Sequence, residues 1–129
     1  MSFISRSSAA LSRLLGRAPA SAPIVEKATQ LIQSNPCVVF SKSTCPFCQM
    51  AKGALQDNKA KCHILEMDKE LSPEEMAALQ DHFLKTTGAR SVPRVFIDGN
   101  CVGGGSEVSD LAQKGELKAM LEKAKALEE

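Results

Sequence analysis

The stretch CVVFSKSTCPFCQMAKGAL, residues 37–55, joins an apolar run, a pair of cysteines and a helical pattern in that order. Its first four residues, 37–40, are continuously apolar and follow Pro36, which is typical of a strand covered on both faces in a parallel sheet. The apolar residues after the second cysteine recur with a helical period as far as Leu55. The stretch therefore predicts a buried strand that leads into a helix through a loop carrying Cys45 and Cys48.

The residues on either side of this stretch predict an alternating α/β pattern. Ser72 and Pro73 have the composition of a helix start, and Gly88 has that of a helix stop. Residues 98–100 have the composition of a hairpin turn. The order α-β-α-β-α-β-β-α predicts three layers, with four mixed strands between helices on both faces, which is the thioredoxin-like plan. The expected helices span 24–34, 46–57, 72–88 and 108–127, the last divided near Gly115, and the expected strands span 37–40, 62–67, 93–97 and 101–102.

The first 22 residues differ in composition from the rest of the chain. They contain Arg6, Arg13 and Arg17, six serines and no acidic residue, which is the signature of a mitochondrial presequence. Arginine interrupts each apolar stretch, so neither a secretory signal nor a membrane span is expected. We predict a presequence over 1–22, a folded domain over 23–129 and a mitochondrial location. The alternative is a disordered tail on a cytoplasmic protein.

The composition of the whole chain excludes several kinds of protein. With 43% hydrophobic and 24% charged residues, it is typical of a soluble globular domain. A net charge of +1 and the lack of a basic patch argue against binding to nucleic acid. The chain has five cysteines, which is an odd number, and it shows no secretory signal. Both observations favour a reducing compartment over a framework of disulfides. Cys37 and Cys62, both in predicted strands, are therefore expected to be free thiols that fill the core.

Cys45 and Cys48 have the spacing of a redox pair at the start of a helix. A thiolate is the attacking species in disulfide exchange, and the unpaired N–H groups of a helix N-terminus stabilise negative charge. Cys45, with the cationic Lys42 nearby, is therefore predicted to be the nucleophile. Pro46 suits the first helical turn, and Phe47 offers an apolar wall beside the sulfur. Cys48, one turn further on, is predicted to be the sheltered resolving thiol.

Zinc binding is the alternative use of this spacing, because Cys-x-x-Cys forms half of many zinc sites. A closed zinc site needs two further ligands with matching local spacing. The remaining candidates show no second paired motif, so no metal site is expected. These candidates are Cys37, Cys62, His63, His82 and Cys101.

Three separated motifs make the chain resemble the dithiol glutaredoxins over residues 24–127. They are the loop over 41–48, the segment Ser91-Val92-Pro93, and the glycines that precede Ser106. Thioredoxins look different at the active site, with Trp before the first cysteine and Gly-Pro between the pair. The resemblance implies a thioredoxin-like α/β/α fold with a four-stranded mixed sheet and a cis Pro93 before the third strand.

The resemblance also implies a glutathione site beside Cys45. Its expected contacts are Lys42 and Gln80 at the glycine carboxylate, the Val92 backbone beside Pro93 at the cysteinyl part, and Ser106 and Glu107 at the γ-glutamyl end. A helix N-terminus suits a carboxylate because its first N–H groups are unpaired. The sequence departs from the family pattern at two positions of the expected site. Phe47 replaces the common Tyr and loses a hydroxyl, and Glu107 replaces the common Asp and is longer by one methylene.

The resulting hypothesis is a glutathione-dependent thiol-disulfide oxidoreductase. Cys45 alone would reduce mixed disulfides between proteins and glutathione, and Cys45 with Cys48 would reduce protein disulfides. We expect a monomer that acts on glutathionylated or disulfide-containing proteins, with no membrane or nucleic-acid partner. One alternative is a glutathione-ligated iron–sulfur cluster bridging two copies, against which Pro46 argues. The other alternative is a thioredoxin-type reductase.

Overall fold

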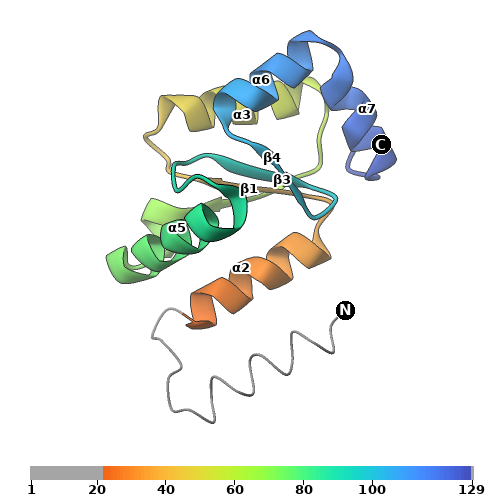
Figure 1. Ribbon diagram of the computed structural model, residues 1–129. Coiled ribbons are helices and arrows are strands. Elements are labelled where there is room, and N and C mark those ends of the chain that lie inside the picture. The colour runs from red at the N-terminus through yellow and green to blue at the C-terminus, as the bar shows by residue number, and fades with distance from the viewer. Residues whose placement is uncertain (1–21, 129) are drawn as a thin grey trace.

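The computed structural model describes residues 22–128 of the chain (Figure 1). The predicted presequence, residues 1–22, lies outside the described residues except for Ala22. None of the helices within residues 22–128 is long and apolar enough to cross a membrane. The helices are α2 (Ala22–Ser34), α3 (Pro46–Asp57), α4 (Met67–Glu70), α5 (Pro73–Thr87), α6 (Gly105–Gln113) and α7 (Glu116–Lys123), and the strands are β1 (Cys37–Ser41), β2 (His63–Glu66), β3 (Arg94–Ile97) and β4 (Asn100–Gly103).

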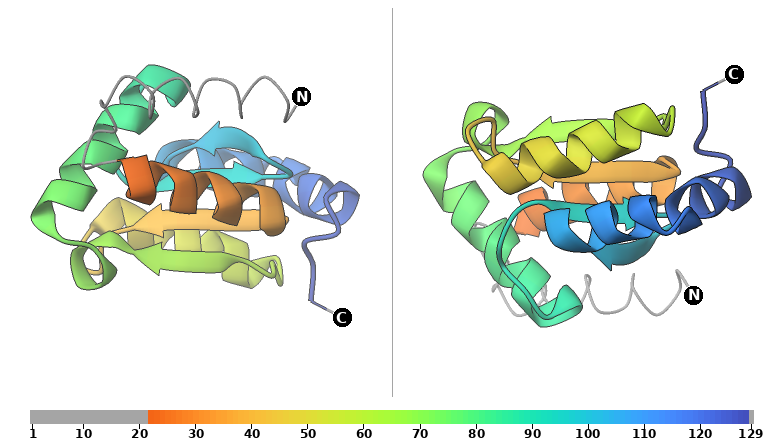
Figure 2. Two further views of the ribbon diagram at one scale, coloured as in Figure 1. Left: turned by 90° about the horizontal axis from the view of Figure 1, so that it is seen from below. Right: turned by 90° about the horizontal axis from the view of Figure 1, so that it is seen from above.

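The strands form one four-stranded mixed sheet in the order β2-β1-β3-β4. β1 pairs in parallel with β2 and antiparallel with β3, and β3 pairs antiparallel with β4. Helices α2 and α5 lie on one side of the sheet, and α3, α6 and α7 lie on the other (Figure 2). The predicted three-layer α/β/α fold with a four-stranded mixed sheet is confirmed.

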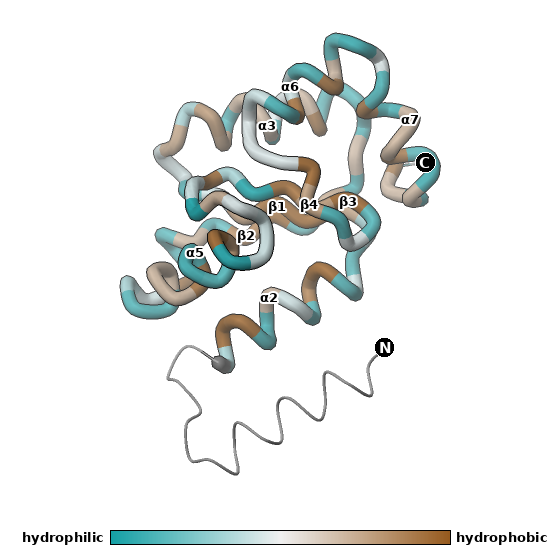
Figure 3. Tube along the Cα trace, in the orientation of Figure 1, coloured by the Kyte–Doolittle hydropathy of each residue, from teal (hydrophilic) through white to brown (hydrophobic). Residues whose placement is uncertain are grey.

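Apolar side chains alternate between the two faces of β1, so that each face has its own core. Val38 and Phe40 pack with Phe83 of α5 on one face, while Val39 packs with Leu55 of α3 on the other. Every residue of β1 is fully buried, and the apolar strands lie in the middle of the molecule (Figure 3). This burial on both faces explains why the first strand reads as an uninterrupted apolar run.

Several element boundaries differ from those predicted, and two of these differences change the element to which a residue belongs. The second strand was expected to include Met67, but β2 ends at Glu66, and Met67 begins the short helix α4. Met67 is fully buried, so its apolar side chain reaches the core from a helix instead of a strand. The C-terminal helical segment begins at Gly105, earlier than predicted. Gly115, with a φ of 76°, separates α6 from α7 at the predicted break.

Both ends of α5 have the predicted signals. The Ser72 hydroxyl accepts the Glu75 N–H at 3.1 Å, and the Glu75 carboxylate accepts the Ser72 N–H at 2.9 Å. Gly88 ends the helix in the left-handed conformation, with a φ of 86°, which a glycine adopts without steric cost. These caps fix the start of the segment that leads into β3.

Cys37 and Cys62 are joined by a disulfide, so the prediction that they are free core thiols is wrong. The parallel pairing of Val38 with His63 places the two preceding residues opposite each other, with 4.5 Å between the Cα atoms of the cysteines. A disulfide can span that separation. The bond closes a loop at a sequence separation of 25, and restricting the unfolded chain in this way contributes about 3 kcal/mol. The number of cysteines does not predict this bond, because the parallel register of the two strands is what brings the two residues together.

Candidate active site

Cys45 is the N-cap residue of α3, at the junction between the loop after β1 and the helix. The Cys48 N–H donates a hydrogen bond to Cys45 Sγ over 3.3 Å. Pro46 occupies the first helical position, where an N–H would have no partner within the helix. The donated N–H and the positive end of α3 together stabilise negative charge on Cys45 Sγ.

Cys48 lies one helical turn further along α3 and is fully buried. Its sulfur accepts a hydrogen bond from the Lys42 N–H at 3.4 Å. Burial raises the pKa of the Cys48 thiol, and the neighbouring Cys45 side chain adds to the increase. Cys48 is therefore a protonated thiol at neutral pH, whereas Cys45 is only half-buried. The pair thus has one accessible sulfur and one sheltered sulfur.

The segment that precedes β3 runs past Cys45. The Val92–Pro93 peptide bond is cis, and the Cys45 thiol donates to the Val92 carbonyl oxygen at 3.8 Å. Val92 is half-buried and Pro93 is buried. The main chain of residue 92 consequently lies beside the sulfur, where an extended peptide can pair with it.

A cavity of about 580 Å³ adjoins this segment, which is a volume typical of small-molecule sites. Its walls come from the start of α3, the segment before β3, and the glycines that lead into α6. Five of the predicted site residues line the cavity, and so the fold brings together positions that are far apart in the sequence. They are Phe47, Val92, Pro93, Ser106 and Glu107.

Ser106 and Glu107 lie in the first turn of α6, whose N-cap is Gly104. Ser106 is exposed at this helix N-terminus, where N–H groups point outward and favour an anion. The Glu107 carboxylate instead turns back and accepts the Gly104 N–H at 2.6 Å. Its Oε1 therefore caps its own helix, and the extra methylene relative to Asp gives the side chain the reach to do so.

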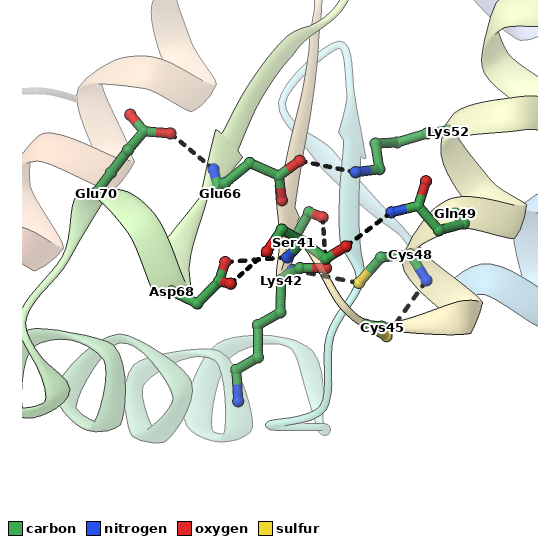
Figure 4. A network of polar contacts seen from close by, with 10 residues as sticks. Ser41, Lys42, Cys45, Cys48, Gln49, Lys52, Glu66, Asp68 and Glu70 are labelled. Atoms are coloured by element: carbon green, nitrogen blue, oxygen red, sulfur yellow. Dashed lines mark hydrogen bonds and ion pairs between the residues drawn. The ribbon is translucent and has the colours of Figure 1, made fainter.

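Lys42 and Gln80 are the two predicted glutathione contacts that do not line the cavity. The Lys42 side chain extends away from both cysteine sulfurs (Figure 4). The Gln80 side chain donates to the Arg90 carbonyl oxygen at 2.9 Å, which ties α5 to the segment that leads to Val92. In this geometry Gln80 supports the wall of the site from outside.

Helix α6 packs tightly against the active-site helix at Gly105. A Cβ atom at that position would lie 2.6 Å from the Phe47 carbonyl oxygen and 3.1 Å from the Phe47 Cβ. The Phe47 side chain itself is 53% exposed, beside the cavity. Only a glycine at position 105 lets the two helices pack at this distance with their ends facing the same cavity.

Two polar residues of the site were missed by the sequence interpretation. Arg94 lines the cavity although it is only 7% exposed, and its Nε donates to the Pro93 carbonyl oxygen at 3.1 Å. Asp68 accepts hydrogen bonds from both the N–H and the hydroxyl of Ser43, which lower the pKa of its carboxyl and hold the loop before Cys45. A charged residue inside the predicted buried strand over 93–97 was the available signal for Arg94; Asp68 left no such signal.

The residues described, 22–128, contain no group of three or more His, Cys, Asp or Glu side chains that could hold a metal ion.

Comparisons with known proteins agree with this geometry. The family model described as Glutaredoxin matches residues 37–102. Glutaredoxin-1 of Rattus norvegicus is 41% identical over 97 residues, covering 75% of this chain and 91% of that protein. Oxidized glutaredoxin 2 from Chlamydomonas reinhardtii superposes with a TM-score of 0.77 at 36% identity, covering 84% of this chain and all of that one. A buckwheat glutaredoxin–glutathione complex gives a TM-score of 0.76 at 36% identity, covering 84% and 96%. The chain belongs to the glutaredoxin family.

Proposed function

We propose that this protein reduces disulfides with glutathione, using Cys45 as the nucleophile. The observation that carries the proposal is the position of Cys45 Sγ, at the N-cap of α3 and 3.8 Å from the Val92 carbonyl oxygen next to the cavity. A relative of similar fold, the buckwheat protein, was solved as a complex with glutathione. The main chain at Val92 and the α6 N-terminus at Ser106 offer a tripeptide both strand-like pairing and an anion site.

The first route needs only Cys45. Its thiolate attacks the glutathione sulfur of a protein–glutathione mixed disulfide, and the S–S bond breaks to release the protein as a thiol. A second glutathione thiolate then attacks the glutathione sulfur bound to Cys45. Glutathione disulfide leaves, and the Cys45 thiolate is regenerated with no net change in the enzyme.

The second route uses both cysteines and applies to disulfides within proteins. Cys45 attacks one sulfur of the substrate, and the mixed disulfide that forms is resolved by Cys48. The substrate leaves as a dithiol, and the enzyme is left with a Cys45–Cys48 disulfide that two glutathione molecules reduce. The sheltered position of Cys48 supports this division of roles, because it can reach Cys45 but not an incoming substrate.

Replacing Cys48 with serine is expected to separate the two routes. The Cys48→Ser variant should retain turnover of a small glutathione mixed disulfide. Its reduction of a protein disulfide should fall by about 100-fold or more, because an intramolecular attack is replaced by a bimolecular one. Both rates are measured with glutathione, and then with a flavoprotein thioredoxin reductase as the donor in place of glutathione. An equal loss of turnover on the two substrates in Cys48→Ser would contradict this function. Faster turnover with the flavoprotein donor than with glutathione would also contradict it and would favour the thioredoxin-type alternative.

We also propose a mitochondrial form of the family, on the composition of residues 1–22. Replacing Arg6, Arg13 and Arg17 with glutamine is expected to abolish uptake of the full chain into isolated, energised mitochondria, because presequence recognition depends on the basic face. Protection of the chain from added protease is the measurement, and unmodified chain with uncoupled mitochondria is the control. Uptake that persists without the three arginines would favour the cytoplasmic alternative.

A further inference from the structure

Two charged residues stand among those that line the cavity beside Cys45, and they carry opposite signs. Arg94, on β3, contributes a guanidinium, and Glu107, on α6, contributes a carboxylate. The γ-glutamyl end of glutathione also carries both signs, an α-carboxylate and an ammonium group. Which of these two ligand groups the protein recognises therefore depends on which of its own two charged residues is available to bind.

The Glu107 carboxylate is already bonded to its own helix. Its Oε1 accepts the Gly104 N–H at 2.6 Å. Gly104 is buried, so turning the carboxylate toward a ligand would take this partner from a buried N–H group, which is costly. The Glu107 side chain also packs over the main chain of Gly103, where an added Cβ would lie 2.7 Å from the Glu107 Cγ. These two contacts keep the Glu107 charge away from the ammonium group of a ligand.

The Arg94 guanidinium, by contrast, has no anionic partner. Arg94 is buried, and within residues 22–128 it takes part in no ion pair. The one hydrogen bond that its side chain donates to these residues runs from Nε to the Pro93 carbonyl oxygen, which leaves both Nη groups without a protein partner. A buried cation without an anion is costly. Arg94 therefore marks a part of the cavity where the ligand supplies the anion.

The Arg94 guanidinium lies beside the N-terminus of α6. A Cβ atom at Gly104, the N-cap residue, would lie 2.9 Å from Arg94 Nη2. The first N–H of the chain to bond back within α6 is that of Val108, which donates to the Gly104 carbonyl oxygen at 3.0 Å. The N–H groups of Gly105 and Ser106 thus have no partner within the helix, and its positive end favours an anion. The guanidinium and these N–H groups meet at one corner of the cavity, which suits a carboxylate.

We propose that the site recognises the γ-glutamyl end of glutathione by its α-carboxylate, bound between the Arg94 guanidinium and the N-terminus of α6, and that it does not recognise the ammonium group. The inference rests on the proposed function, because it takes glutathione as the ligand of the cavity. It widens the class of substrates, since mixed disulfides of glutathione acylated on its amino group should react as well as those of glutathione itself.

The first test uses the unmodified chain and three small mixed disulfides. One is made with glutathione, one with glutathione acetylated on its amino group, and one with glutathione whose γ-glutamyl α-carboxylate is converted to an amide. The measurement is kcat/KM for each mixed disulfide, which reports the attack by Cys45 separately from the later reduction by glutathione. We expect acetylation to leave kcat/KM unchanged. The amide should lower it by about 10- to 100-fold, the effect of losing hydrogen bonds between charged groups.

Arg94→Gln tests whether the guanidinium is the group that binds the α-carboxylate. It should lower kcat/KM by about 10- to 100-fold for the glutathione and acetylated substrates. It should change kcat/KM little for the amide, which has no carboxylate to lose, and Arg94→Lys should recover part of the rate because it keeps the charge. An equal loss on all three substrates would indicate a structural role for Arg94 and would overturn this part of the proposal.

Glu107→Gln tests whether the Glu107 charge takes part in binding. The glutamine keeps an oxygen that can accept the Gly104 N–H but has no negative charge, so kcat/KM for glutathione should stay within about twofold of the unmodified chain. Asp110→Asn is the matched control, because it removes the same charge from the same helix at an exposed position, where Asp110 pairs with Lys114 at 3.0 Å. Its rates should also be unchanged.

Two results would show that the ammonium group is recognised and would overturn the proposal. One is a fall in kcat/KM on acetylation as large as that on amidation. The other is a tenfold or larger loss in Glu107→Gln that affects the glutathione substrate and not the acetylated one. Failure of the proposed function is a separate outcome, recognised when the unmodified chain turns over none of the three mixed disulfides, and in that case the inference falls with it.

Discussion

Cys45→Ser is expected to abolish glutathione-dependent disulfide reduction, with a loss of about 10³-fold or more on both glutathione mixed disulfides and protein disulfides. Both routes begin with attack by this sulfur, and a serine hydroxyl remains protonated in the same position. Cys48 cannot replace it, because that thiol is fully buried and its pKa is raised. Steady-state turnover with excess glutathione measures the loss, and mass spectrometry of a trapped mixed disulfide identifies the attacked residue.

Cys101→Ser is the matched control for this variant. Cys101 is the remaining free cysteine among residues 22–128; it is half-buried on β4 and packs against the core on the α2–α5 side. Its replacement should leave both rates unchanged. Substantial turnover by Cys45→Ser, or a mixed disulfide trapped at Cys101, would overturn the assignment of the nucleophile.

Gly105→Ala is expected to lower both the stability of the protein and its affinity for glutathione. The added methyl group would lie 2.6 Å from the Phe47 carbonyl oxygen, a main-chain atom that cannot move without shifting α3. Forcing one carbon into such a contact costs about 1–3 kcal/mol. Because α6 and Phe47 form facing parts of the same cavity, the shift should also raise the KM for glutathione by about tenfold, which corresponds to about 1.4 kcal/mol.

Gly53→Ala is the control for this prediction. Gly53 lies inside α3, and a Cβ at that position meets nothing within 4 Å. The methyl group should therefore stabilise the protein by about 0.5–1 kcal/mol through helix propensity, with KM unchanged. Chemical denaturation and initial rates of both variants provide the comparison. A Gly105→Ala protein as stable as the unmodified chain would show that the α3–α6 contact relaxes freely.

The parts of the fold that could be predicted are those set by local chemistry. The apolar run 37–40 predicts a strand covered on both sides, and the first strand is indeed buried throughout. Ser72 and Gly88 mark the ends of α5 through a capping box and a left-handed residue. Each of these signals acts within a few residues of its own position, and therefore leaves its full pattern in the sequence.

What could not be predicted depends on register and on side-chain reach. The Cys37–Cys62 disulfide follows from the parallel alignment of β1 with β2, and the Ser41–Glu66 partnership follows from the same alignment. The capping of Gly104 by Glu107 depends on the conformation of one flexible side chain. For Lys42 and Gln80 the family resemblance identified positions near the site, but the directions of their side chains are set by tertiary contacts.

The position of the disulfide between Cys37 and Cys62 affects how easily glutathione can reduce it. Residues 37–62 form a covalent ring, and both Cys45 and Cys48 sit inside it. Cys37 is fully buried, so a glutathione thiolate would have to attack the sulfur of Cys62. The leaving group would then be the Cys37 thiolate, a charged group in apolar surroundings. The Cys37–Cys62 disulfide should therefore stay intact through many catalytic cycles in the glutathione buffer that supports turnover.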